Sequence, residues 1–162
     1  MPGPAQRKKQ ALELFQRAYE AQSRGDLDEA IRGYRRSIEI FPTAEAHTFL
    51  GWTYSFQKRY DEAISECRRA IAVDPDFGNP YNDIGAYLIE LGKLDDAIPW
   101  LEKATRARRY ESPCFPYFNL GRVWEKKGLW PRALGCYEDA LRSNPDYRIA
   151  QRAILRLRAN DN

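Results

Sequence analysis

Three acidic pairs recur along the chain and are the first residues whose types could do chemistry: Asp28-Glu29, Asp61-Glu62 and Asp95-Asp96. Neighbouring carboxylates can hold a divalent cation or exchange a proton with a substrate. The three pairs stand, however, at the same place of a repeated pattern, where a carboxylate caps free amides and suits the positive end of a helix. We therefore interpret them as helix starts, and expect neither a metal site nor an acid–base site from them.

A single histidine and three cysteines are the other reactive residues. His47 has no second metal ligand near it in the sequence, and a lone histidine on a helix is better explained as a packed side chain. Cys67, Cys114 and Cys136 are odd in number and lack C-x-x-C spacing, which argues against disulfides and zinc. We interpret them as reduced thiols, with Cys67 and Cys136 as small core residues.

The usual motifs of enzymes do not occur in the sequence. It contains no Gly-rich phosphate loop, no G-x-S-x-G and no cysteine paired with a nearby base. We therefore predict that the protein is not an enzyme, that it binds no cofactor or metal, and that it has no small-molecule substrate.

The composition is that of an ordinary globular domain. The 162 residues are 43% hydrophobic and 30% charged, and 26 basic and 23 acidic residues give a net charge of +3, which is too balanced to indicate a polyanionic partner. No apolar run approaches the ~18 residues of a membrane span, and residues 1–10 are polar and basic, without the apolar core of a signal peptide. We expect a cytoplasmic protein.

Small residues at nearly constant spacing indicate the elements that position all these side chains. Alanines recur 33, 34 and 36 residues apart, glycines recur 34 and 36 apart, and a second series of small residues keeps the same steps. The three series are Ala30, Ala63, Ala97 and Ala133; Gly51, Gly85 and Gly121; and Ser37, Ala70, Ala104 and Ala140. A period near 34 residues with two helical patterns per unit predicts helix pairs stacked into a solenoid.

Residues that break helices support this division. Gly25, Gly92 and Gly128 stand where the first helix of a unit (helix A) ends, and Lys58 holds that place in the second unit. The second helix (helix B) ends before a proline in three units. The third unit instead runs through residues 106–113, which predicts either a longer helix or a bulged connection.

The helix A motifs have large, large, small and large residues on one face. They are His47-x-x-Leu50-Gly51-x-x-Tyr54, Tyr81-x-x-Ile84-Gly85-x-x-Leu88 and Tyr117-x-x-Leu120-Gly121-x-x-Trp124. With the alanines and prolines of helix B they resemble the tetratricopeptide repeat family, whose pattern is W-x2-L-G-x2-Y, then A-x3-F, A and P. The resemblance covers residues 11–145 and is weakest in the first helix A.

The resemblance implies an all-α fold: a right-handed α-solenoid of antiparallel helix pairs. We expect a basic extension over residues 1–10 and a single domain over 11–162, with units at about 11–43, 44–77, 78–113 and 114–145. A helix over about 146–160 has Ala150, Ala153, Ile154 and Leu157 on one stripe, as a solenoid cap requires.

In that family, helices A line a concave groove that binds peptides. The groove positions carried onto this chain include Phe15, Tyr19, Thr48, Trp52, Phe56, Asn79, Asn82, Asp83, Phe115, Phe118, Asn119 and Arg122. Asparagine amides can hold a peptide backbone, and aromatic rings supply contact area with few rotors to freeze. The alternative is that Phe15, Tyr19 and Phe118 pack between helices; Trp52 and Phe115 are the residues we expect to be exposed.

A clamp of lysines, asparagines and arginine captures acidic chaperone tails in some repeat domains of this family. This chain has Phe15 and Tyr19, then Phe49, then Asn79 and Asp83 at those places, and starting one unit later supplies no cation either. A carboxylate needs cationic donors, so the sequence argues against binding of a chaperone C-terminus.

The function predicted from the sequence is therefore a protein-interaction module that binds an extended peptide or a partner helix in the groove. Self-association as a structural scaffold is the alternative. Contact with nucleic acid or a membrane surface through Arg106, Arg108, Arg109 and the last helix is the weakest reading, because the charge is nearly balanced.

Overall fold

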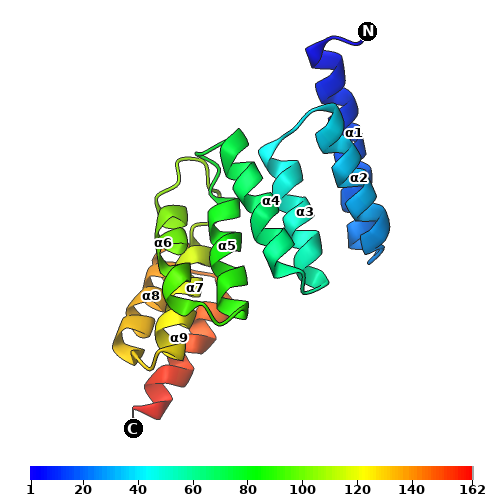
Figure 1. The fold of residues 1–162 in the computed structure, drawn as a ribbon. Coiled ribbons are helices and arrows are strands. Elements are labelled where there is room, and N and C mark those ends of the chain that lie inside the picture. Colours follow the sequence, from blue (N-terminus) through cyan, green and yellow to red (C-terminus); the bar gives the residue numbers. More distant parts are fainter. Residues whose placement is uncertain (162) are drawn as a thin grey trace. The chain divides into compact units, whose positions relative to one another are not determined.

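The computed structural model describes residues 1–161, which form nine α-helices and no strand (Figure 1). The predicted all-α class is confirmed. No helix in the described part of the chain is long and apolar enough to cross a membrane. The chain divides after Pro75 into two compact units, and each unit is described here by itself.

The first unit consists of two antiparallel helix pairs, α1 (Pro4–Ser23) with α2 (Leu27–Ile40) and α3 (Ala44–Phe56) with α4 (Tyr60–Val73). Residues 4–10, expected as an extension, are the first turns of α1. Helices α1 and α2 approach closely because Gly33 lies against Ala18. Ser37 donates a hydrogen bond to the carbonyl of Ala11 at 2.6 Å, which satisfies a buried hydroxyl in this contact.

The second unit contains α5 (Asn79–Glu90), α6 (Leu94–Thr105), α7 (Cys114–Lys126), α8 (Trp130–Ser143) and α9 (Arg148–Asn160). Helix α5 pairs with α6 and α7 with α8, and α9 packs on α8. The buried side of α9 consists of the predicted Ala150, Ala153, Ile154 and Leu157. Three of these join Ala133 and Tyr137 in one apolar cluster, so α9 covers the end of the helix pair before it.

The ends of the helices A confirm one prediction, and the starts of the helices B correct another. Gly25, Gly92 and Gly128 have φ of 82°, 76° and 77°, and Lys58, which holds their place in the second repeat, has φ of 58°. The acidic pairs were expected to cap helix B, but only Asp26 accepts a capping bond, from the amide of Glu29. The pairs themselves lie inside the first turn of their helices, where the helix dipole still favours negative charge.

The stretched third connection is a bulge and not a longer helix. Helix α6 ends at Thr105, and the following chain returns to the start of α5. The amide of Arg109 donates to the carbonyl of Asp76 at 2.9 Å, and the amide of Gly78 donates to the carbonyl of Arg109 at 2.9 Å. The Tyr110 ring lies against Gly78, where a Cβ would not fit. The extra residues of this repeat therefore form a short backbone bridge within the second unit.

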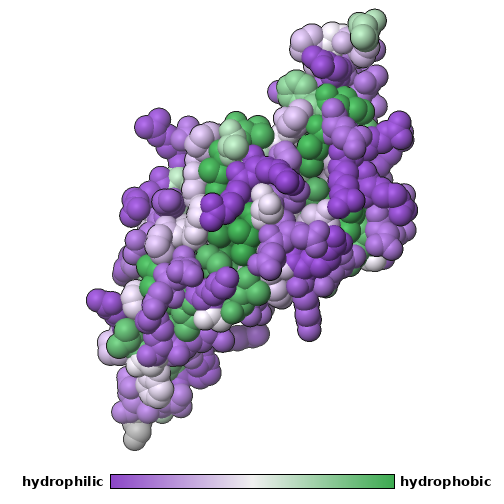
Figure 2. Space-filling view, in the orientation of Figure 1, coloured by the Kyte–Doolittle hydropathy of each residue, from purple (hydrophilic) through white to green (hydrophobic). Residues whose placement is uncertain are grey.

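Hydrophilic residues cover much of the face drawn in Figure 2, with hydrophobic residues between them. Several large apolar side chains of the described residues are exposed, and five of them are aromatic: Tyr19, Trp52, Phe56, Phe115 and Trp130. Most of these residues lie on helices A, so the helix A side of each unit is the candidate binding surface.

Candidate partner-binding surfaces

Five aromatic residues of α1 and α3 form a continuous surface in the first unit, here named the aromatic strip: Phe15, Tyr19, Phe49, Trp52 and Phe56. Phe49 is its centre, with ring centroids 5.2 Å from Phe15, 5.8 Å from Tyr19 and 5.8 Å from Trp52. Trp52 in turn lies 5.0 Å from Phe56. The edge-to-face geometry of the three Phe49 contacts is a favourable one for aromatic pairs.

The aromatic strip passes from the interior to the surface. At its inner end Phe15 and Phe49 contact Tyr34, which is fully buried. At its outer end the exposed fractions of Tyr19, Trp52 and Phe56 are 42%, 40% and 55%. A cluster held on one side by the core and open on the other is a preorganised apolar contact surface.

An apolar pocket adjoins the inner end of the aromatic strip. It has a volume of about 270 Å³ and includes Phe15 of the strip and the exposed Leu12 one turn earlier. Lys8 and Glu45 also line it and place one charge of each sign there. The pocket is large enough for one apolar side chain of a partner.

Thr48, also predicted for the groove, lies beneath this surface. It is 4% exposed, and its hydroxyl donates to the carbonyl of Ala44 at 2.7 Å. Phe49, in contrast, was not among the predicted groove residues and is the centre of the strip. The spacing of Phe49, Trp52 and Phe56, three and then four residues, is the signal that could have identified it.

In the second unit, polar side chains join α5 to α7. Asn119 donates from Nδ2 to Oδ1 of Asn82 at 2.9 Å, and Arg122 donates to Asn119 at 3.0 Å and to Glu90 at 3.1 Å. Asn82 and Asn119 are each 8% exposed. Their amides hold the two helices in register, and a partner would reach Arg122 and Glu90 before them.

Asp83 and Asn79 lie on the same side of α5. Asn79 is exposed and Asp83 is half-buried. Burial raises the pKa of the Asp83 carboxyl to about 7, although a hydrogen bond from Asn82 opposes the shift. Near neutral pH this carboxyl is therefore divided between its neutral and charged forms.

Aromatic residues also gather at the start of α7. Phe115 and Phe118 each lie 5.5 Å from the Tyr147 ring, and Phe118 lies 5.2 Å from Tyr137. Phe115 is 42% exposed, whereas Phe118 is half-buried between helices. The exposure predicted for Trp52 and Phe115 is thus confirmed, and their role in binding stays a prediction.

A basic pocket of about 490 Å³ opens beside Phe118 in the second unit. Its charged lining consists of Arg122, Lys126, Arg156 and one acid, Glu125, and Tyr137 completes it. Glu125 accepts hydrogen bonds from Arg156 and from the Tyr137 hydroxyl. These bonds, the one from Arg156 above all, lower the pKa of Glu125, so the pocket keeps an excess of two positive charges at neutral pH.

Eight of the twelve predicted groove residues are thus divided between two surfaces, and Thr48, Asn79, Asp83 and Phe115 belong to neither. The first unit brings together Phe15, Tyr19, Trp52 and Phe56 around Phe49. The second unit brings together Asn82, Asn119 and Arg122 by hydrogen bonds, with Phe118 beside Arg122 in the basic pocket.

Comparison with known protein families matches three segments, all described as tetratricopeptide repeat. They are residues 44–77, 79–110 and 117–149, which together form more than half of the chain. The matched boundaries lie close to the second, third and fourth units predicted from the spacing of alanine and glycine.

Curated relatives share this repeat. The small glutamine-rich tetratricopeptide repeat-containing protein 2 of Saccharomyces cerevisiae is 28% identical over 100 residues, which cover 61% of this chain and 29% of that protein. The type IV pilus assembly protein PilF of Pseudomonas aeruginosa is 28% identical over 122 residues, 75% of this chain and 48% of the relative. The chain thus spans less than half the length of either relative.

Solved structures share the fold. The structure of Pseudomonas aeruginosa PilF matches with a TM-score of 0.88 at 24% identity, over 96% of this chain and 70% of that chain. The first repeat domain of Spaghetti (RPAP3), bound to the HSP90 peptide SRMEEVD, matches with a TM-score of 0.67 at 22% identity, over 75% of this chain and 98% of that chain.

Proposed function

The chain belongs to the tetratricopeptide repeat family, and from this premise we propose that it is a non-catalytic module that binds a protein partner, as an extended peptide or a helix, on the helix A side of its units. The family and its fold are in general those of interaction scaffolds. A relative of the same fold holding a peptide supports this class of function.

The aromatic strip carries the proposal. Three of its rings are at least 40% exposed, and each of them is held by contacts with other rings of the strip. Their removal from water would therefore contribute favourable free energy of binding, and little side-chain entropy would be lost. Interfaces draw much of their affinity from such aromatic anchors. An apolar or aromatic segment of a partner is the chemistry that fits this surface, with one side chain in the adjoining apolar pocket.

The second unit offers a different chemistry. Its basic pocket has an excess of cationic groups, and Arg122 lies between that pocket and the amides of Asn82 and Asn119. A carboxylate on the partner would find charge-assisted donors there. We therefore propose that apolar contacts in the first unit and acidic ones in the second belong to the same binding function.

The residues in the place of the chaperone clamp favour a partner other than an acidic chaperone tail. Phe15, Tyr19 and Phe49 occupy three of its places and belong to the aromatic strip. The relative that binds the HSP90 peptide therefore supports peptide binding as a class, and its ligand is not carried over to this chain.

The experiment is a selection of peptides from a random library against the full chain, followed by affinity measurements on the variants W52A/F56A and W130A. Trp130 is the matched control because it is exposed to a similar extent, 45% against 40%, and lies at the start of α8. We expect the strip variant to lose about tenfold or more in affinity and W130A to keep it.

Circular dichroism shows whether both variants keep their helices. We expect that they do, because Trp52, Phe56 and Trp130 are all exposed. Selected peptides that bind folded W52A/F56A as tightly as the unmodified chain would exclude the aromatic strip as the site.

Self-association is a second candidate function, favoured by two exposed apolar side chains of α9. Ile149 and Leu155 are 52% and 67% exposed, although the stripe of α9 that faces α8 is buried. Two copies could cover these side chains mutually. Light scattering over a concentration series tests this, because a constant monomer mass up to high concentration would exclude it.

A further inference from the structure

The aromatic strip has few polar side-chain atoms, and they are donors. Trp52 has an indole Nε1–H and Tyr19 has a hydroxyl, whereas Phe15, Phe49 and Phe56 have no polar side-chain atom. Within residues 1–161, neither the indole of Trp52 nor the hydroxyl of Tyr19 forms a hydrogen bond. An indole N–H can only donate, and a phenol can donate or accept. No side chain of the strip is charged, so its specificity depends on these two groups.

A third donor lies at the inner side of the strip. Gln22 follows Phe15 by seven residues and Tyr19 by three, and therefore lies on the same side of α1. Its Oε1 accepts a hydrogen bond at 2.6 Å from the hydroxyl of Tyr34, on whose ring the strip rests. Its Nε2 is buried and has no partner in the described part of the chain. A buried donor without a partner costs free energy, which an acceptor on a ligand would recover.

The rings of the strip form a stepped surface. The planes of Tyr19 and Trp52 are inclined by 76° and 84° to the plane of Phe49, and both centroids lie 5.8 Å from that of Phe49. Phe49 is half-buried, whereas Tyr19 and Trp52 are exposed. The centroids of the two exposed rings are therefore separated by at most twice that distance. One turn of a polyproline II helix rises about 9 Å, so successive turns of such a helix can contact both rings.

The donors restrict the kind of backbone that this surface can remove from water. An extended segment of ordinary residues has an N–H group at each residue, and the Tyr19 hydroxyl is the one side-chain group of the strip that could accept from it. An α-helix has already bonded its own carbonyl groups, which leaves the donors of Trp52 and Gln22 without a partner. Both kinds of segment therefore match the strip poorly.

A proline-rich segment matches the strip on both counts. Proline has no N–H group, and the carbonyls of a polyproline II helix are free because this helix has no internal hydrogen bonds. Its pyrrolidine rings supply apolar contact area for the aromatic faces. The conformation is also largely formed before binding, so little chain entropy is lost.

We propose that the aromatic strip binds a proline-rich segment of a partner protein in the polyproline II conformation. Its prolines lie on the rings of Tyr19, Trp52 and Phe56, and one of its carbonyls accepts a hydrogen bond from Nε1 of Trp52. This inference rests on the function proposed above, since it names the class of partner for the same site.

The experiment is an NMR titration of the ¹⁵N-labelled full chain with acetyl-decaproline amide, observed through the indole N–H signals. The chain has four tryptophans, and the signals of Trp52 and Trp130 are identified by their absence from the spectra of W52F and W130F. We expect a saturable downfield shift of the Trp52 indole proton, because it gains an acceptor. The Trp130 signal should not move.

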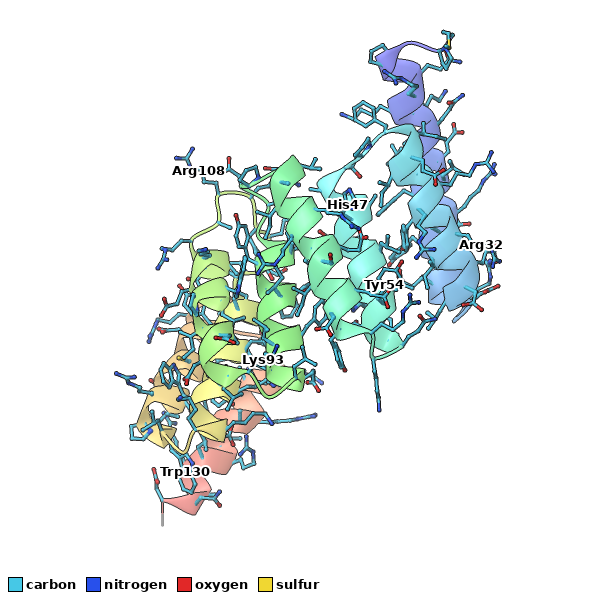
Figure 3. All side chains as sticks on the ribbon, viewed as in Figure 1. Arg32, His47, Tyr54, Lys93, Arg108 and Trp130 are labelled. Atoms are coloured by element: carbon cyan, nitrogen blue, oxygen red, sulfur yellow. The ribbon has the colours of Figure 1, made fainter. Side chains whose placement is uncertain are left out.

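The two variants also separate the hydrogen bond from the aromatic contact. Trp52→Phe keeps an aromatic ring and removes the donor, so it should weaken binding of the proline peptide about threefold to tenfold. Trp130→Phe is the same exchange at a residue of similar exposure, at the start of α8 (Figure 3), and should leave the affinity unchanged. Circular dichroism and thermal unfolding show that both variants are folded.

A second peptide, in which every second proline is replaced by alanine, tests the argument from the missing N–H groups. It restores backbone donors for which the strip has almost no acceptor, and we expect it to bind about tenfold more weakly than decaproline.

The proposal is overturned if decaproline leaves the Trp52 indole unshifted, if W52F and W130F bind it equally, or if the alanine-containing peptide binds as tightly. Library peptides without proline that lose affinity for W52A/F56A would assign the strip to another apolar segment, helical or extended. That result overturns this inference and leaves the proposed function in place. If no selected peptide depends on the strip, both proposals fail.

Discussion

Gly85 of α5 lies directly against the side chain of Leu101 of α6. A Cβ at position 85 would overlap the Cγ and one methyl group of the leucine, and Gly121 of α7 has the same relationship with the Tyr137 ring of α8. Gly85 and Gly121 are thus places where a large residue of helix B approaches the backbone of helix A. Removing this space should be costly in both helix pairs.

We predict that Gly85→Ala lowers the free energy of unfolding by about 1–3 kcal/mol, since an added methyl in a filled contact forces neighbouring side chains out of their preferred rotamers. Chemical denaturation followed by circular dichroism measures it. Gly135→Ala is the control, because nothing lies within 4 Å of a Cβ built there in α8. It should gain about 0.5–1 kcal/mol from helix propensity, and equal effects at both positions would refute the packing explanation.

Lys58 holds a left-handed backbone conformation for which the other repeats use glycine. With φ of 58°, it costs about 1–2 kcal/mol relative to an ordinary conformation. Lys58→Gly should therefore stabilise the protein by about 1 kcal/mol, as measured by thermal and urea unfolding. Gln57→Gly, one residue earlier at φ of −92°, should instead destabilise it by up to about 1 kcal/mol. A loss of stability at both positions would contradict the prediction.

Asp83 should make stability fall as the pH rises. Burial raises the pKa of its carboxyl from 3.8 to about 7, so between these values the folded state binds a proton that the unfolded state has released. The free energy of unfolding then decreases with pH across this window. Asp83→Asn imitates the neutral carboxyl and should gain about 1–3 kcal/mol over the unmodified chain at pH 8, but little at pH 4.

Denaturation at several pH values checks this, with Asp96→Asn of α6 as a control for the loss of one exposed charge. A difference between the Asp83 variant and the unmodified chain that stays constant from pH 4 to pH 8 would show that the carboxyl titrates normally.

The Glu125–Arg156 pair should contribute stability with the opposite dependence on pH. The hydrogen bond from Arg156 lowers the pKa of Glu125, so the contribution is present above the ordinary glutamate pKa and disappears as the pH falls through the lowered value. Because Arg156 is half-exposed, Arg156→Ala should cost only about 0.5–1 kcal/mol at pH 7, and nothing in strong acid. Arg152→Ala, exposed on the same helix, should be neutral at both pH values.

Much of the fold could be predicted because it depends on local sequence. Ala30, Ala63, Ala97 and Ala133 are all fully buried, as their regular spacing requires. The left-handed turn at Lys58 also followed from its place in the repeat, since the chain geometry is repeated even where the residue type is not. Spacing within one helix or turn is sufficient for such predictions.

The parts of the candidate site that were missed depend on contacts distant in sequence. The bond between Asn82 and Asn119 joins residues 37 apart, and whether an amide faces a partner or another amide depends on how α5 and α7 pack. Phe49 is central because α1 lies beside α3, which no pattern within α3 reveals. The acidic pairs were assigned as caps because their distance from the helix start is known only to a residue or two without coordinates.

The backbone bridge between Asp76, Gly78 and Arg109 has a consequence for how proteases meet this chain. The stretch from Arg106 to Arg109 contains three arginines, the preferred cleavage sites of trypsin, and the side chains of all three are exposed. A protease must draw several residues into an extended conformation, yet the amide and carbonyl of Arg109 are already bonded to the chain before α5. Cleavage after Arg109 therefore requires that the start of α5 first release this segment, so the most basic connection of the chain is cut more slowly than its composition implies.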